Sequence, residues 1–193
     1  MQPGPRWLAY GDSITEGMAA SAPSRSWPAV VGRALDIDVV NLGFAGAARG
    51  EVALAEQMIA LGGDALSVAV GTNCWSRVPT SAAQMEANME AFLAVLRQGL
   101  PGVPIVVVSP ILRPDAELSP NRFGASLQDL RAAIERMAEA APDTRLIRGR
   151  ELVTAEQLPD GVHPDDAGHA AIAAAVAPPS RSCPARSGSK VPI

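Results

Sequence analysis

The chain of 193 residues is poor in the residue types that mark several classes of protein: it has two cysteines, two histidines and one lysine. Two cysteines, Cys74 and Cys183, are too few for a disulfide framework or a cysteine-rich metal site. One lysine, scattered arginines and a net charge of −4 leave no basic patch for nucleic acid. No apolar run is long enough to span a bilayer. We therefore expect no nucleic acid partner and no membrane span.

The ends of the sequence differ in character from its middle. Residues 1–6 contain no apolar signal region, which leads us to expect a cytoplasmic protein. The whole chain is 48% hydrophobic and 19% charged, which suits one compact domain with a real core. Beyond Val176 the composition turns to proline, serine and arginine. We expect a single domain over residues 1–177 and a flexible tail over residues 178–193.

Apolar runs alternate with segments of helical period along the chain. Continuous runs of Val, Ile and Leu are typical of parallel strands that are buried on both faces. The predicted strands are Trp7–Tyr10, Ile37–Leu42, Ala65–Val70, Ile105–Ser109 and Arg145–Ile147. The predicted helices are Trp27–Leu35, Glu51–Leu61, Ala82–Gln98, Ser126–Ala140 and Asp165–Val176, with Ser26 before Pro28 as a helix start.

This alternation predicts an α/β fold, a three-layer α/β/α sandwich around a five-stranded parallel sheet in the flavodoxin-like order 2-1-3-4-5. In such sheets the site lies beyond the carboxyl ends of the strands, where the strand order reverses between strands 1 and 3. Ser13 follows the first strand, and Gly71-Thr72-Asn73 follows the third. We expect these two segments to face each other across that crevice.

Ser13 lies in Gly11-Asp12-Ser13-Ile14-Thr15, on a turn between a predicted strand and a helix start. A serine hydroxyl is a weak nucleophile and needs a base, for which histidine is the usual choice. His163 lies in a loop, and Asp160, three residues earlier, could accept a hydrogen bond from its Nδ1–H. The other histidine, His169, opens the last helix and is expected to pack or cap locally.

Acyl transfer also needs hydrogen-bond donors for a developing oxyanion. Three donors follow three predicted strands: the backbone N–H of Ser13, the backbone N–H of Gly46 and the side-chain amide of Asn73. The irregular segment Pro110–Gly124 is expected to border or cover the site.

Gly11-Asp12-Ser13, Gly46, Gly71-Thr72-Asn73 and Asp160-Gly161-Val162-His163 occur in the order and approximate spacing of the SGNH (GDSL-type) esterase/lipase superfamily of hydrolases, which the chain resembles from Trp7 to Val176. The resemblance implies a catalytic triad of Ser13, His163 and Asp160, and an oxyanion hole of Ser13, Gly46 and Asn73. It implies a serine-dependent ester hydrolase without cofactor or metal, acting on small-molecule esters, thioesters or acylated sugars. Ile14 replaces the leucine of the motif's name, and Cys74 stands where many relatives have aspartate.

Three functions remain open at this point. Ser26-Trp27-Pro28-Ala29-Val30 and Asn41-Leu42-Gly43-Phe44 resemble a bacterial branch that includes an acyltransferase of aromatic polyketide tailoring. The same triad could therefore move an acyl group to an alcohol instead of to water. A non-catalytic binding module on the same fold is the third reading. The sequence specifies neither the acyl and alcohol groups nor the oligomeric state.

Other readings of the same residues are weaker. Gly43, Gly46 and Gly50 miss the spacing of a dinucleotide-binding loop. A metal site could be read from Asp160, His163, Asp165, Asp166 and His169. The spacing of the two histidines does not match that of ligand pairs on a helix, and Asp165 and Asp166 suit a helix N-terminus better. Cys74 is expected to be a small buried hydrophobe, and Cys183 an exposed thiol of the tail.

Overall fold

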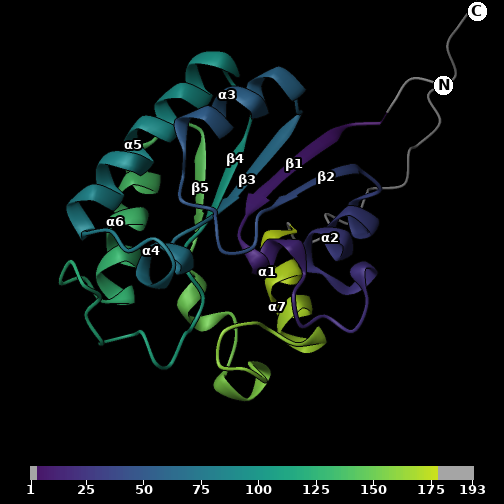
Figure 1. The fold of residues 1–193 in the computed structure, drawn as a ribbon. Coiled ribbons are helices and arrows are strands. Elements are labelled where there is room, and N and C mark those ends of the chain that lie inside the picture. Colours follow the sequence, from purple (N-terminus) through teal and green to yellow (C-terminus); the bar gives the residue numbers. More distant parts are fainter. Residues whose placement is uncertain (1–3, 178–193) are drawn as a thin grey trace, which may run out of the picture.

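The computed structural model describes residues 4–177, which form five parallel strands between two layers of helices (Figure 1). The strand order is β2-β1-β3-β4-β5, as predicted. Every predicted strand is present, with its ends moved by one residue at most. The strands are β1 (Arg6–Gly11), β2 (Asp38–Gly43), β3 (Ala65–Ala69), β4 (Ile105–Val108) and β5 (Thr144–Ile147).

All the long helices that the sequence predicts are also present. They are α2 (Trp27–Leu35), α3 (Val52–Leu61), α5 (Ala82–Gly99), α6 (Leu127–Ala140) and α7 (Asp166–Val176). The sequence did not predict the one-turn helix α4 (Thr72–Ser76), which follows β3. The other short elements are α1 (Ser13–Glu16) and three 3₁₀ turns, η1 (Pro23–Arg25), η2 (Gly149–Glu151) and η3 (Ala155–Gln157).

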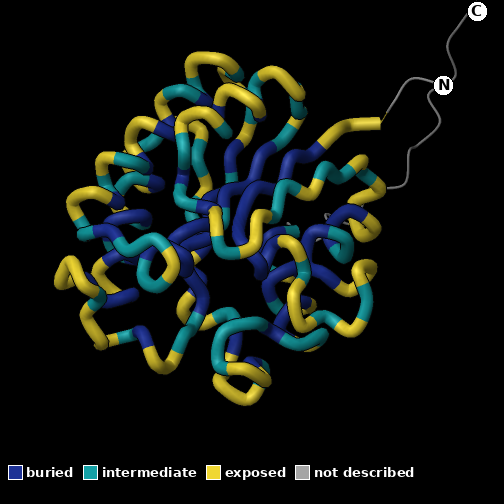
Figure 2. Tube along the Cα trace, in the orientation of Figure 1, coloured by how far each residue is buried: buried dark blue, intermediate teal, exposed yellow. Residues whose placement is uncertain are grey.

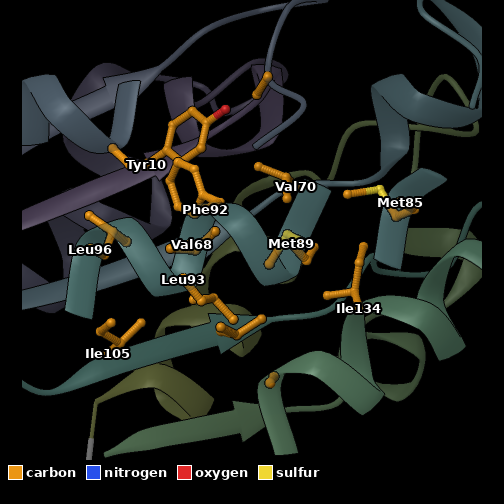
Figure 3. Close-up of a cluster of buried hydrophobic side chains, with 14 of the residues drawn as sticks. Tyr10, Val68, Val70, Met85, Met89, Phe92, Leu93, Leu96, Ile105 and Ile134 are labelled. Atoms are coloured by element: carbon orange, nitrogen blue, oxygen red, sulfur yellow. The ribbon is translucent and has the colours of Figure 1, made fainter. Parts of the chain in front are cut away.

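Side chains on alternate sides of the strands form two separate cores. On one side Leu8 and Tyr10 pack with α3, α5 and α6, where Tyr10 lies against Phe92 with ring centroids 5.4 Å apart (Figure 3). On the other side Trp7 and Ala9 pack with α2 and α7. This alternation follows from the two-residue period of a strand, and it confirms the three-layer arrangement.

Burial differs between the centre and the edges of the sheet (Figure 2). The expectation that strands are buried on both faces holds for β1, whose residues beyond Arg6 are all buried. The edge strand β2, whose run is interrupted by Asp38 and Asn41, has no fully buried residue. One polar residue of β2 has a structural role, because Asn41 Nδ2 donates to the carbonyl oxygen of Thr15 at 2.9 Å. That bond ties the edge of the sheet to α1.

The register of the sheet places three loops together at the carboxyl end of the strands. Gly11, the last residue of β1, is paired with Gly43 of β2 and Ala69 of β3. Ser13, Gly46 and Asn73 follow these residues by two to four positions. The three segments therefore meet beyond the carboxyl ends of β1, β2 and β3, where the crevice was predicted.

Two further expectations concern the C-terminal tail and a membrane span. The predicted tail, with Cys183, lies outside the described residues. Within residues 4–177, no helix has the length and apolar character needed to cross a membrane.

Candidate active site

Ser13, His163 and Asp160 form a continuous chain of hydrogen bonds. Ser13 Oγ lies 2.8 Å from His163 Nε2, and His163 Nδ1 lies 2.6 Å from Asp160 Oδ2. An ionised carboxylate can only accept, so Nδ1 carries a proton and Nε2 is left to accept from the serine hydroxyl. The structure thus brings together the three residues that the sequence singled out, from segments 150 residues apart.

Asp160 is held as an anion by three donors. Burial alone would raise its pKa, but hydrogen bonds from the His163 ring and from the backbone N–H groups of His163 and Val162 outweigh burial and lower the pKa to about 2. The two backbone donors lie 2.7 and 2.9 Å from Asp160 Oδ1. They close a tight loop in which Gly161 has a φ of +78°, a conformation that favours glycine.

Asp12 positions the nucleophile as the N-cap of α1. Its Oδ1 accepts from the backbone N–H of Ile14 at 2.9 Å, which is the capping role expected for this residue type. Asp12 is 2% exposed, and burial raises its pKa to about 6 against the opposing hydrogen bond from Ile14 and the attraction of His163. The side chain therefore fixes the turn that presents Ser13.

A pocket of about 600 Å³ opens over the serine. It contains all three predicted oxyanion residues, and its walls are Ser13, Met18, Ala45, Gly46, Thr72, Asn73, Ser76, Arg77, Arg113, Val162 and His163. Asn73 is buried, and its Oδ1 has no hydrogen-bond partner within residues 4–177. Gly46 has a φ of +72°. A second cavity, of about 550 Å³, lies around the amino ends of β1, β3, β4 and β5 and contains no serine or histidine.

Backbone contacts hold Asn73 in place without the aspartate that many relatives have after it. The Asn73 carbonyl accepts from Arg77 and Val78 at 2.9 and 3.0 Å, and the Cys74 carbonyl accepts from Thr80 at 2.9 Å. The Cys74 side chain is fully buried in the core, and burial raises the pKa of its thiol to about 12. Cys74 is therefore the small buried hydrophobe that was expected, and an inert one.

The second histidine lies outside the pocket and supports α2. His169 Nδ1 accepts from the backbone N–H of Trp27 at 3.3 Å, and His169 Nε2 lies 3.3 Å from the carbonyl oxygen of Met18. The prediction that Ser26 starts α2 is correct in position, but the Ser26 hydroxyl bonds back to Pro23 and does not cap the helix. His169 supplies that bond from a distant part of the chain.

The residues considered for a metal site or a phosphate-binding loop make structural hydrogen bonds instead. Asp165 accepts from the Gly168 N–H as the N-cap of α7, and Asp166 accepts from Ser21. Within residues 4–177, no group of three or more His, Cys, Asp or Glu side chains is placed to hold a metal ion. Among the glycines read as a possible phosphate loop, Gly50 donates its N–H to the Tyr10 hydroxyl at 3.1 Å.

Sequence reasoning did not single out five residues of the pocket wall: Met18, Ala45, Ser76, Arg77 and Arg113. The signal for Arg77 was its spacing, since it follows Asn73 by four residues, one turn of the unpredicted helix α4. The segment Pro110–Gly124 borders the pocket, as expected. It is tied to α4 by a bond of 2.8 Å from Trp75 Nε1 to the Ser119 carbonyl.

Comparison with known proteins gives a family and a set of similar structures. Residues 9–171 match the model of the GDSL-like Lipase/Acylhydrolase family. No curated protein sequence matches.

Three solved structures illustrate the range of structural similarity. The salicylyl-acyltransferase SsfX3 from a tetracycline biosynthetic pathway is 27% identical with a TM-score of 0.79, over 91% of this chain and 53% of its own. A putative GDSL-like lipase from Bacteroides ovatus is 24% identical with a TM-score of 0.75, over 88% and 50%. A carbohydrate esterase family 3 protein from Talaromyces cellulolyticus is 18% identical with a TM-score of 0.70, over 90% and 95%.

The chain thus spans about half the length of the first two structures. The family model, in contrast, extends from β1 into α7 and includes every residue of the hydrogen-bonded chain described above. On that match, the protein belongs to the GDSL-like lipase/acylhydrolase family.

Proposed function

We propose that the protein is a carboxylic ester hydrolase that works through an acyl-enzyme on Ser13. The observation that carries the proposal is the chain of hydrogen bonds from Ser13 to His163 to Asp160, at 2.8 and 2.6 Å. It opens on a pocket large enough for a small ester. A nucleophile, a base and an orienting carboxylate in hydrogen-bond contact are what nucleophilic catalysis by serine requires.

In the acylation step, Ser13 Oγ attacks the ester carbonyl carbon while its proton passes to His163 Nε2. The carbonyl π electrons move to oxygen, and the resulting oxyanion accepts hydrogen bonds from the N–H groups of Ser13 and Gly46 and from Asn73 Nδ2. Asp160 stabilises the imidazolium through Nδ1–H. The intermediate collapses, the bond to the alcohol oxygen breaks, and His163 Nε2–H protonates the departing alcohol.

In the second step the same groups act on water. His163 Nε2 accepts a proton from a water molecule as the water oxygen attacks the acyl carbon, and the oxyanion donors again stabilise the charge. Collapse of this intermediate breaks the bond to Ser13 Oγ, which regains its proton from His163. The products are a carboxylic acid and a free enzyme.

Acyl transfer to an alcohol is the second candidate. It is favoured by one observation, the 27% identity with a salicylyl-acyltransferase over 91% of this chain. The transferase would use the same residues, with an acceptor alcohol in place of water. Product analysis at increasing acceptor concentration separates the two: a transferase forms the new ester at the expense of the acid, and a hydrolase forms only the acid.

A fluorophosphonate probe tests the proposal directly, because it reacts only with an activated serine. We expect covalent labelling of the wild-type protein at Ser13, mapped by peptide mass spectrometry, and no labelling of Ser13→Ala. Ser119→Ala is the matched control, because Ser119 is exposed and lies outside the pocket wall. A panel of p-nitrophenyl esters of varied chain length and of acetylated sugars then identifies the acyl preference.

One result would favour the third reading, a binding module that kept the fold. If folded wild-type protein is not labelled and turns over no ester of the panel, Ser13 is not activated and the proposal fails.

A further inference from the structure

The pocket over Ser13 has a charge opposite to that of the protein. The whole chain has a net charge of −4 and a single lysine. The pocket wall nevertheless contains two arginines, Arg77 and Arg113, and no aspartate or glutamate. Fixed charges at the mouth of a cleft attract ligands of the opposite sign.

Arg113 is held rigidly at the rim. Its guanidinium lies 4.7 Å from the centre of the Trp75 ring, and its Nη1 donates to Ser76 Oγ at 3.2 Å. Its side chain is 13% exposed. Asp115, which lies outside the pocket wall, pairs with Arg113 Nε at 3.0 Å and partly neutralises it. Arg113 therefore contributes a fixed, reduced positive charge.

Arg77 is the free charge of the pocket. Within residues 4–177 its side chain makes no ion pair and no hydrogen bond of its own, although its backbone N–H caps α4 through the Asn73 carbonyl. It lies beside the proposed oxyanion hole, since a Cβ placed on Gly46 would be 4.0 Å from Arg77 Cγ. A guanidinium on this wall can give two parallel hydrogen bonds to a carboxylate or phosphate.

We infer that the substrate is an ester that carries a negative charge on its acyl or alcohol group, and that Arg77 is the residue that selects it. The inference rests on the proposed ester chemistry at Ser13 and adds the substrate class. The wall is more polar than apolar, and its apolar side chains are only Met18, Ala45 and Val162. Arg77 is exposed, so an anionic group bound in the pocket can reach its guanidinium, whereas a hydrocarbon gains nothing from that charge.

Two pairs of esters that differ only in charge test the inference and locate the anionic group. For the alcohol side, 4-acetoxybenzoate is compared with its methyl ester. For the acyl side, mono-p-nitrophenyl adipate is compared with methyl p-nitrophenyl adipate. In at least one pair we expect the charged ester to have a kcat/KM about tenfold higher, the size of one charge-assisted hydrogen bond. The preference should shrink as salt is added.

Three variants assign the effect to one side chain. Arg77→Gln should reduce the charged-to-neutral ratio of kcat/KM about tenfold, mostly through KM, and Arg77→Lys should restore part of it. Arg122→Gln is the matched control, because Arg122 lies over the Phe123 ring, outside the pocket wall. It should leave the ratio unchanged.

Binding to Ser13→Ala separates the inference from the proposed chemistry. Titration of this variant with each ester should give a Kd about tenfold lower for the charged member, with Arg77→Gln in the same background removing the difference. That result would show that Arg77 selects an anionic ligand even if no ester were hydrolysed, in which case only the proposed hydrolysis fails. Equal values of Kd and kcat/KM within both pairs, or a preference for the neutral esters, would overturn the inference while leaving hydrolysis intact.

Discussion

Replacing the two histidines one at a time should separate stability from activity. His169→Ala removes a fully buried ring and leaves the buried N–H of Trp27 without its acceptor. An unsatisfied buried donor costs about 1–3 kcal/mol, and the lost packing of the ring adds roughly 1 kcal/mol. The two costs sum to a loss of about 2–4 kcal/mol. Both bonds of His169 are long, at 3.3 Å, which favours the lower end of that range.

Thermal unfolding with ester turnover measured on the folded protein is the assay. For a domain of this size, a loss of about 2–4 kcal/mol lowers Tm by roughly 4–16 °C. His163→Ala should show the reverse pattern, with Tm nearly unchanged and turnover lowered by a factor of about 10⁴ or more. His169→Asn is the intermediate variant, because its amide oxygen can still accept from the Trp27 N–H, and it should lose less stability than His169→Ala.

Two results would refute this reasoning. One is a His169→Ala protein as stable as the wild type, which would mean that the bond to Trp27 contributes nothing. The other is a larger loss of activity per folded molecule in His169→Ala than in His163→Ala, which would identify His169, and not His163, as the base.

Three further predictions concern single groups. Asn73→Ala should lower kcat/KM by a factor of about 10²–10³ in steady-state assays, because it removes one proposed oxyanion donor. Asp160→Asn should lower kcat by a factor of about 10²–10⁴, measured from pH 5 to 9, because the amide cannot stabilise the imidazolium. His169 should make the protein less stable to urea as the pH falls below about 6.5. Burial lowers its pKa in the folded state, so below 6.5 the unfolded state binds a proton that the folded state does not. His169→Ala should lack that part of the pH dependence.

The strands and long helices were predictable because their signals are local. Ile105-Val106-Val107-Val108 and the run from Trp7 to Tyr10 are apolar at every position, as central parallel strands must be. The strand order then followed from the rules for connections between parallel strands. That order placed Ser13 and Asn73 together at the carboxyl end of the sheet. Burial is lower in the edge strand β2, where the exposed residues Asp38 and Asn41 interrupt the apolar run.

The features that the sequence did not reveal depend on contacts between distant segments. Helix α4 is one turn long, and such a short helix has too few residues for its periodicity to be recognised. Without it, Arg77 could not be placed beside Asn73. The cap of α2 was assigned to Ser26, the adjacent residue of the right type, whereas the bond comes from His169, 142 residues away. Local capping rules cannot anticipate an acceptor supplied by another helix.

Gly11, the glycine that precedes Asp12-Ser13 in the motif, is also required by the packing of the fold. A Cβ on Gly11 would clash with the Thr15 side chain and lie 2.7 Å from the Ala69 carbonyl oxygen. Its register partner Gly43 is equally crowded, since a Cβ there would lie 2.5 Å from Glu16 Cα. Two glycines side by side at the end of the sheet thus let α1 sit directly on β1 and β2. That close approach sets the position of Ser13 relative to the loop of Gly46. The glycine of the motif is therefore needed for packing, and through packing for the placement of the nucleophile.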